Sequence, residues 1–306
     1  GLDLYAFDEG NQTWRWLATT KDNYYNSTGS VQMMGSAASL YPKGHLVRYR
    51  LHLPLYNGVA SLSIGYVSPG VVQQDSSYAT SNPVVWYGTS IAQGGVVSRP
   101  GMAFTNQIAR RLGREVLNFG FSGNGLMEIS VAQSLVEIEA GAFVIDCLWN
   151  MSPEQIQENA IPLVKYIRSR HPTTPIVLAE DTDAGAAWIE TSTEQLQTEK
   201  RKQLSAAFEA LRKTDSNLHY VVHGVLYNFT HNIASDDHSL ISPTVGGCHP
   251  TDLGQTAIAH YYSLFLPSLL TNNSNSNSSN SNNINIKHNH NHNHNHNYNH
   301  NYNHNH

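Results

Sequence analysis

From residue 83 to residue 270, short apolar runs alternate with segments of helical periodicity. The longer segments place apolar residues three and four positions apart, as an amphipathic helix does. Alternation of strands and helices favours a parallel sheet covered by helices on both faces, and so an α/β fold. The predicted strands are 84–87, 115–119, 142–148, 176–179 and 218–222, and the predicted helices are 102–112, 126–140, 153–170, 194–213 and 250–270.

The first 80 residues have a different pattern. Apolar and polar residues alternate in 14–17, 46–53 and 59–67, and Asn-Gly and Pro-Lys-Gly turns separate these stretches. Such alternation is typical of antiparallel strands that are buried on one face. We therefore expect a small β-sandwich domain at 1–80, a linker rich in Ser, Gln and Pro at 68–82, and an α/β domain at 83–270.

From residue 271 to 306 the sequence consists of Asn/Ser repeats followed by alternating Asn and His. This composition offers almost nothing apolar to bury, which predicts a disordered tail. Its histidines, beginning with His288, His290 and His292, have the chemistry to chelate transition metals, but a solvated tail without a role is the simpler interpretation.

Charge and hydropathy exclude several classes of partner. The 306 residues carry a formal net charge of -5 with 18 Lys and Arg, and no basic run appears. Nucleic acid is therefore not an expected partner. No apolar stretch is long enough to span a membrane.

Cys147 and Cys248 are too few for a disulfide framework and are expected to be free thiols. Asn-x-Ser/Thr sites, among them Asn11, Asn26, Asn228, Asn272 and Asn277, favour a secreted protein, and because the sequence starts at Gly1, we expect an upstream segment.

Four predicted loops at the carboxyl ends of the strands contain residues that acyl transfer requires. They supply Ser90, Gly123, Asn150 and His249, in that order. In an open α/β sheet these loops share one crevice. Taken alone, each has a simpler interpretation: Ser90 and Gly123 as turn residues, Asn150 as a cap of the helix at 153, and His249 as a surface residue. Their joint occurrence favours a site.

The chemistry assigns each residue a role. A serine hydroxyl attacks an ester carbonyl when a neighbouring base accepts its proton, and histidine is the base best suited to neutral pH. The oxyanion that forms needs hydrogen-bond donors fixed in advance. We therefore predict Ser90 as nucleophile, His249 as base, and an oxyanion hole built from Ser90, Gly123 and the Asn150 side chain. This mechanism requires no metal or organic cofactor.

These four residues resemble the blocks of the SGNH (GDSL-type) esterase and acylhydrolase superfamily, with Gly-Thr-Ser-Ile at 88–91 where many members have Gly-Asp-Ser. Residues 1–5, 53–58, 98–102 and 249–254 are similar to the subgroup with an amino-terminal Gly-x-Asp-Leu-Tyr β-sandwich. The resemblance implies a flavodoxin-like three-layer hydrolase domain and a partial sandwich with an unprotected edge. It also implies a small-molecule or carbohydrate ester as substrate, with a small acyl group such as acetyl.

One position departs from the family pattern. Members usually carry an aspartate three residues before the histidine, where this chain has Gly246. That carboxylate normally accepts the imidazole Nδ1 proton and fixes the tautomer. Three interpretations follow: a backbone carbonyl orients His249 in a Ser-His dyad, which we prefer; Asp236 or Asp237 serves as third member; or the protein is a weakened or inactive relative that acts by binding. Asp252 is better suited to supporting the start of the last helix.

Overall fold

A computed structural model describes residues 1–20, 46–66, 69–75, 81–182, 184–222 and 243–270. These residues belong to one compact unit that extends from Gly1 to Ser274. The predicted tail at 271–306, with its histidines, lies outside the described residues, as do Asp236 and Asp237. The proposed division into domains at residues 80 and 83 stays a prediction.

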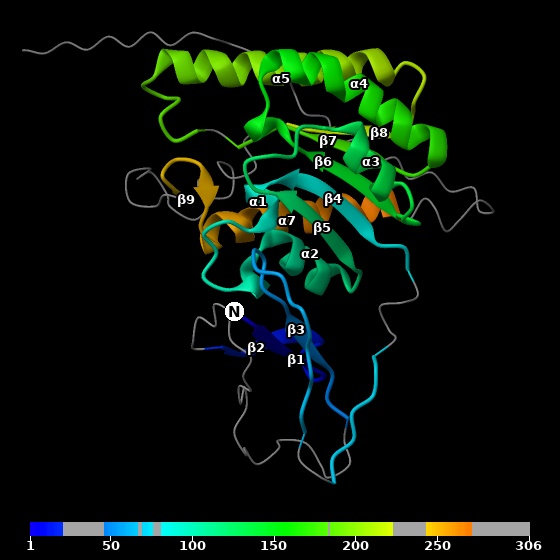
Figure 1. Cartoon of the computed structure of the whole chain (residues 1–306), viewed down its shortest axis with the longest axis vertical. Helices are drawn as coiled ribbons and strands as arrows, with labels where there is room; N and C mark the ends of the chain where they lie inside the picture. Colours follow the sequence, from blue (N-terminus) through cyan, green and yellow to red (C-terminus); the bar gives the residue numbers. More distant parts are fainter. Residues whose placement is uncertain (21–45, 67–68, 76–80, 183, 223–242, 271–306) are drawn as a thin grey trace, which may run out of the picture. The chain divides into compact units, whose positions relative to one another are not determined.

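A five-stranded parallel sheet forms the centre of the α/β part (Figure 1). Its strand order is β5-β4-β6-β7-β8, which is the flavodoxin-like order. In this order the chain reverses direction across the sheet between β4 and β6, so the crevice for a ligand opens at their carboxyl ends. The strands are β4 (Val84–Thr89), β5 (Val116–Phe121), β6 (Ala142–Asp146), β7 (Ile176–Ala179) and β8 (Leu218–Val221), close to the predicted runs.

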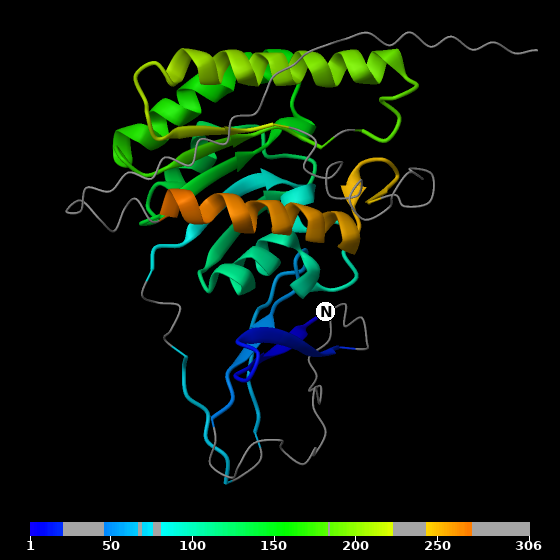
Figure 2. The ribbon, with the colours of Figure 1, turned by 180° about the vertical axis from the view of Figure 1, so that it is seen from behind.

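Helices cover both faces of this sheet, as Figures 1 and 2 show from opposite sides. One face packs against α2 (Phe104–Leu112) and α7 (Asp252–Leu270), and the other packs against α3 (Ile129–Leu135), α4 (Pro153–Arg170) and α5 (Thr191–Leu211). The fold class predicted from strand and helix alternation is therefore confirmed. Short helical turns complete the α/β part: α1 (Ser90–Gln93), η1 (Pro100–Met102) and η2 (Leu148–Asn150).

The side chains of β4 explain why its sequence is a continuous apolar run. Successive side chains of a strand point to opposite faces. Val85 and Tyr87 belong to the core beneath α3, α4 and α5, whereas Val84 and Trp86 belong to the core beneath α2 and α7. All four are completely buried, because helices cover the sheet on both sides.

Local chemistry sets where the helices begin. Helix α4 starts at Pro153 as predicted, since Ser152 and Gln155 form a capping box there. Helix α3 is shorter than the predicted 126–140 and ends at Leu135. It begins only at Ile129, because Met127 has a φ of 59°, which a right-handed helix does not allow. Helix α7 begins at Asp252 instead of residue 250, because β10 (His249–Pro250) pairs with β9 (Thr244–Val245) in a small hairpin.

The N-terminal residues form a three-stranded antiparallel sheet of order β2-β1-β3. Its strands are β1 (Asp3–Asp8), β2 (Thr13–Thr19) and β3 (Tyr49–His52). The predicted strand at 59–67 is wrong: residues 59–66 are exposed and pair with no strand in the described part of the chain. Among the described N-terminal residues there is this one sheet, so a second layer of the expected sandwich is not seen in them.

The Gly-x-Asp-Leu-Tyr segment holds the N-terminal sheet against the α/β part. The Asp3 carboxylate is fully buried and accepts hydrogen bonds from Trp16 Nε1 at 2.8 Å, Arg99 Nη1 at 2.7 Å and the Gly101 amide at 2.8 Å. The guanidinium of Arg110 lies 4.1 Å from the centroid of the buried Tyr5 ring. Two stretches that stood out in the sequence, 1–5 and 98–102, therefore meet in the structure.

The cysteines are free thiols, and the helices of the described ranges are not membrane-spanning. Cys147 is buried, Cys248 is half-buried, and both are free, as predicted. Of the helices in the described ranges, none combines the length and the apolar character needed to cross a bilayer.

Candidate active site

Closely packed glycines shape the turn that follows β4. A Cβ on Gly88 would lie 2.7 Å from Ala92 Cβ and 2.9 Å from the Asp146 carbonyl oxygen, so only glycine lets α1 fold back onto β4 and β6. Gly125, at a φ of +78°, would place a Cβ 2.4 Å from the Gly88 carbonyl oxygen. This crowding fixes Ser90 at the first position of α1, at the carboxyl end of β4.

The structure brings Ser90 and His249 together. Ser90 Oγ lies 2.9 Å from His249 Nε2, although 159 positions separate the two residues. The hairpin of β9 and β10 presents the imidazole, which is half-buried, and Ser90 is 5 % exposed. This distance is within the range in which a histidine accepts a hydroxyl proton. Their catalytic roles stay predictions.

The two other predicted residues lie in neighbouring loops. Asn150 Nδ2 donates a hydrogen bond to the Asn124 carbonyl oxygen at 2.7 Å, which leaves its second N–H available. Ser152, not Asn150, caps α4, so the capping interpretation of Asn150 is wrong. Gly123 has a φ of +70°, which favours glycine, and its amide has no acceptor among the described residues. The Asn150 side chain therefore contacts the residue that follows Gly123, and the oxyanion roles of Gly123 and Asn150 stay predictions.

No hydrogen-bond partner of His249 Nδ1 occurs in the described residues. Gly246 lies in the turn of the β9–β10 hairpin with a φ of +62°. Asp252 is engaged elsewhere, because its Oδ1 accepts a hydrogen bond of 2.9 Å from the Ser98 amide and thereby ties the loop after α1 to α7. The sequence predicted a role of Asp252 at the helix start and missed this link between loops.

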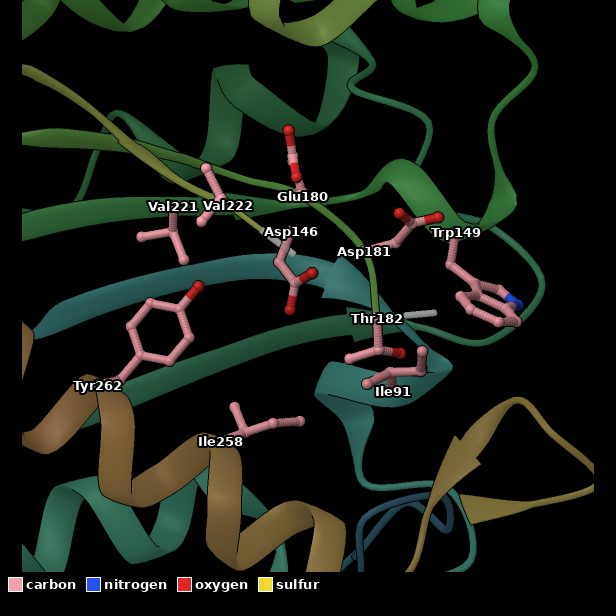
Figure 3. A pocket seen from close by; sticks show the side chains of 10 residues that line it. All are labelled: Ile91, Asp146, Trp149, Glu180, Asp181, Thr182, Val221, Val222, Ile258 and Tyr262. Carbon is pink, nitrogen blue, oxygen red and sulfur yellow. The ribbon is translucent and has the colours of Figure 1, made fainter. Parts of the chain in front are cut away.

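A pocket lined by Ile91, the residue that follows Ser90, lies at the carboxyl end of the sheet (Figure 3). Neither Ser90 nor His249 lines it, and Ile91 is the neighbour that reaches into it. Asp146 lies in this pocket, and burial raises the pKa of its carboxyl to about 7, against the effect of a hydrogen bond from Trp86. Burial also raises the pKa of Asp181, whose carboxylate Oδ1 pairs with Arg201 at 3.1 Å.

The sequence places the pair Glu180 and Asp181 at the end of a strand, where the two residues could line the crevice, be solvated or act as caps. Both residues line the pocket in Figure 3, and Asp181 is buried. Sequence reasoning did not single out Asp146. The available signal was a carboxylate inside the apolar run 142–148, because a buried strand rarely carries an acid without a reason.

Two protein-family models match the sequence of this chain. Residues 81–267 match the model of the GDSL-like lipase/acylhydrolase family. This chain belongs to that family. Residues 1–70 also match the model for the N-terminus of SGNH-hydrolase-type esterases, so the two models together account for nearly all the described residues. No curated protein matches the chain.

Two solved structures have a similar fold. A protein described as a GDSL-like lipase from Bacteroides ovatus is 28% identical, with a TM-score of 0.69 over 88% of this chain and 74% of that one. The salicylyl-acyltransferase SsfX3 from a tetracycline biosynthetic pathway is 21% identical, with a TM-score of 0.52 over 62% of this chain and 55% of that one. The likeness to SsfX3 shows a shared fold alone.

Proposed function

We propose that this GDSL-like protein is a serine esterase that hydrolyses carboxylic esters through Ser90 and His249. The observation that carries the proposal is the 2.9 Å separation between Ser90 Oγ and His249 Nε2. Membership of a lipase and acylhydrolase family supports it. The position of Ser90 at the switch point between β4 and β6, where open α/β sheets bind ligands, supports it as well.

In the first half of the reaction, Ser90 Oγ attacks the ester carbonyl carbon while His249 Nε2 accepts the hydroxyl proton. The tetrahedral oxyanion accepts hydrogen bonds from the amides of Ser90 and Gly123 and from Asn150 Nδ2. The carbon–oxygen bond to the alcohol then breaks, and His249 returns the proton to the leaving oxygen. The products of this half-reaction are the free alcohol and an acyl group on Ser90.

In the second half, water attacks the acyl carbonyl, and His249 accepts its proton. The same donors stabilise the second oxyanion, because the carbonyl oxygen occupies the same position. Collapse breaks the bond to Ser90 Oγ, which regains a proton from His249, and the acid leaves. For Nε2 to act as base in both halves, the imidazole proton must lie on Nδ1.

The substrate class we propose is an ester of a small acyl group, with acetyl on a carbohydrate as the leading example. The resemblance to SGNH esterases supports this choice. The alternative is a binding protein that kept the site but lost turnover, and the glycine at position 246 is the observation that favours it.

Hydrolysis of p-nitrophenyl acetate by the wild type and by Ser90→Ala tests the proposal. We expect Ser90→Ala to lower kcat at least about a thousandfold, because removal of a nucleophile leaves only the residual effect of binding and oxyanion donors. Ser169→Ala is the matched control, since Ser169 is an exposed residue of α4 that bonds only the Tyr166 carbonyl oxygen in the described structure. Equal rates in the wild type and Ser90→Ala would refute the esterase and favour the binding protein.

A further inference from the structure

A tyrosine from the N-terminal part of the chain lies beside the candidate catalytic pair. A Cβ placed on Gly95 would be 2.9 Å from His249 Cδ2, 3.0 Å from the Tyr56 hydroxyl oxygen and 3.3 Å from the Ser90 carbonyl oxygen. The Tyr56 hydroxyl and the Cδ2 edge of the His249 ring therefore both lie next to the same small space at Gly95. Tyr56 is 50% exposed, so part of this residue is accessible from solvent.

Direct contacts hold the Tyr56 segment in place. Gln93 Nε2 donates a 3.0 Å hydrogen bond to the Leu55 carbonyl oxygen, and its Oε1 accepts one of 3.0 Å from the Ser122 amide. The Leu55 side chain also packs against Gly94, where a Cβ would lie 2.7 Å from Leu55 Cδ1. The Gln93 side chain of α1 therefore links Leu55, which precedes Tyr56, to Ser122, which precedes Gly123.

The chemistry of the phenol indicates what it contacts. A tyrosine hydroxyl donates and accepts hydrogen bonds, and its ring offers an apolar face. No hydrogen bond occupies the Tyr56 hydroxyl in the described structure. Such a side chain suits an alcohol that carries further hydroxyl groups on a ring, because it pairs with a hydroxyl and packs on the ring at once.

We propose that Tyr56 is a substrate-contacting residue that binds the hydroxyl-bearing alcohol part of the ester, so that the N-terminal part of the chain completes the active site. This inference rests on the proposed esterase function. It assigns a role in the site to the segment 53–58, which the sequence marked only as part of a resemblance.

The test compares two acetate esters whose alcohol parts are both a six-membered ring that carries the ester on a CH2 group. 6-O-Acetylglucose has ring hydroxyls on its alcohol part, whereas cyclohexylmethyl acetate has none. We expect Tyr56→Phe to lower the ratio of kcat/KM for the sugar ester to that for the cyclohexyl ester roughly five- to tenfold, the usual effect of losing one hydrogen bond. Tyr56→Leu, which also removes the ring, should lower the ratio at least as far.

Tyr66→Phe is the control, because it is the same chemical change at a tyrosine of the N-terminal part that is 61% exposed. An unchanged ratio in Tyr56→Phe, an equal fall in Tyr66→Phe, or a wild type without preference for the sugar ester would each overturn the role of Tyr56. Hydrolysis that survives in Ser90→Ala would instead overturn the proposed function, which distinguishes the two failures.

Discussion

At the scale of single residues, the proposed mechanism depends on the orientation of His249, because that orientation sets how strongly this base would activate Ser90. Its Nε2 faces Ser90, while its Nδ1 has no partner within the described ranges. The position at which the family resemblance predicts a carboxylate is Gly246, where a Cβ would meet nothing within 4 Å. There is therefore space for a side chain, but the φ of +62° disfavours most residues other than glycine.

Gly246→Asp tests whether His249 lacks an orienting group. Asp tolerates a left-handed φ better than most residues, and Gly246→Asn carries the same backbone strain without the charge. We expect kcat for p-nitrophenyl acetate in Gly246→Asp to exceed that in Gly246→Asn by about tenfold or more, because a carboxylate fixes the imidazole tautomer. Equal kcat values would indicate that another group, such as a backbone carbonyl, Asp236 or Asp237, already orients the ring.

At the scale of elements, strand β1 docks the N-terminal sheet through one buried carboxylate. Asp3 accepts three hydrogen bonds, two of them from Arg99 and Gly101 of the α/β part. The nearby His52 accepts a hydrogen bond from Arg110 Nη1 at 2.9 Å, and burial together with the charge of Arg110 lowers its pKa to about 3. His52 is therefore neutral at physiological pH.

Loss of this carboxylate should weaken the whole fold. In Asp3→Ala, Arg99 keeps a partly buried charge without its partner, and two further donors lose their acceptor. We expect the free energy of unfolding to fall by roughly 3–5 kcal/mol, measured by urea denaturation. Glu9→Gln is the control, since Glu9 is an exposed acid that follows the same strand. A loss of equal size in both variants would contradict the docking role of Asp3.

At the scale of the whole molecule, Asp146 links stability to pH. Its pKa of about 7 in the folded chain lies above the ordinary aspartate value, because the carboxyl is buried and faces the carboxylate of Asp181. Between roughly pH 4 and 7 the folded state therefore binds more protons than the unfolded state. The contribution of Asp146 to stability is complete below this range and is lost as pH rises through 7.

The variant Asp146→Asn should lack the dependence of stability on pH that Asp146 causes. Asparagine has nearly the same shape, and its carbonyl oxygen can accept the hydrogen bond of Trp86 Nε1, which measures 3.2 Å in the wild type. We expect the variant to be more stable than the wild type at pH 8, with a difference that shrinks by up to about 1.4 kcal/mol per pH unit as pH falls toward 4.

Urea denaturation across this pH range measures the effect, with Glu139→Gln, an exposed acid, as control. A difference between Asp146→Asn and the wild type that does not vary with pH would contradict the raised pKa of Asp146.

The sequence predicted most of the α/β part because helix and strand periodicities are local properties. The apolar runs placed all five strands of the sheet, and the capping box placed the start of α4. It failed at 59–67, where alternation looks like a strand, because a strand also needs a neighbour to pair with. It also failed at the start of α3, where the positive φ of Met127 delays the helix until Ile129.

By itself, the sequence determined the fold class and the family, since both depend on periodicity and on short motifs. Only the tertiary structure decided which atoms meet: Ser90 with His249, Asp3 with Arg99, and the Tyr56 hydroxyl with the space beside the imidazole. The physical reason is that these contacts join residues far apart in the chain. Their distances depend on strand order and on glycine packing at the turn after β4, which no local pattern specifies.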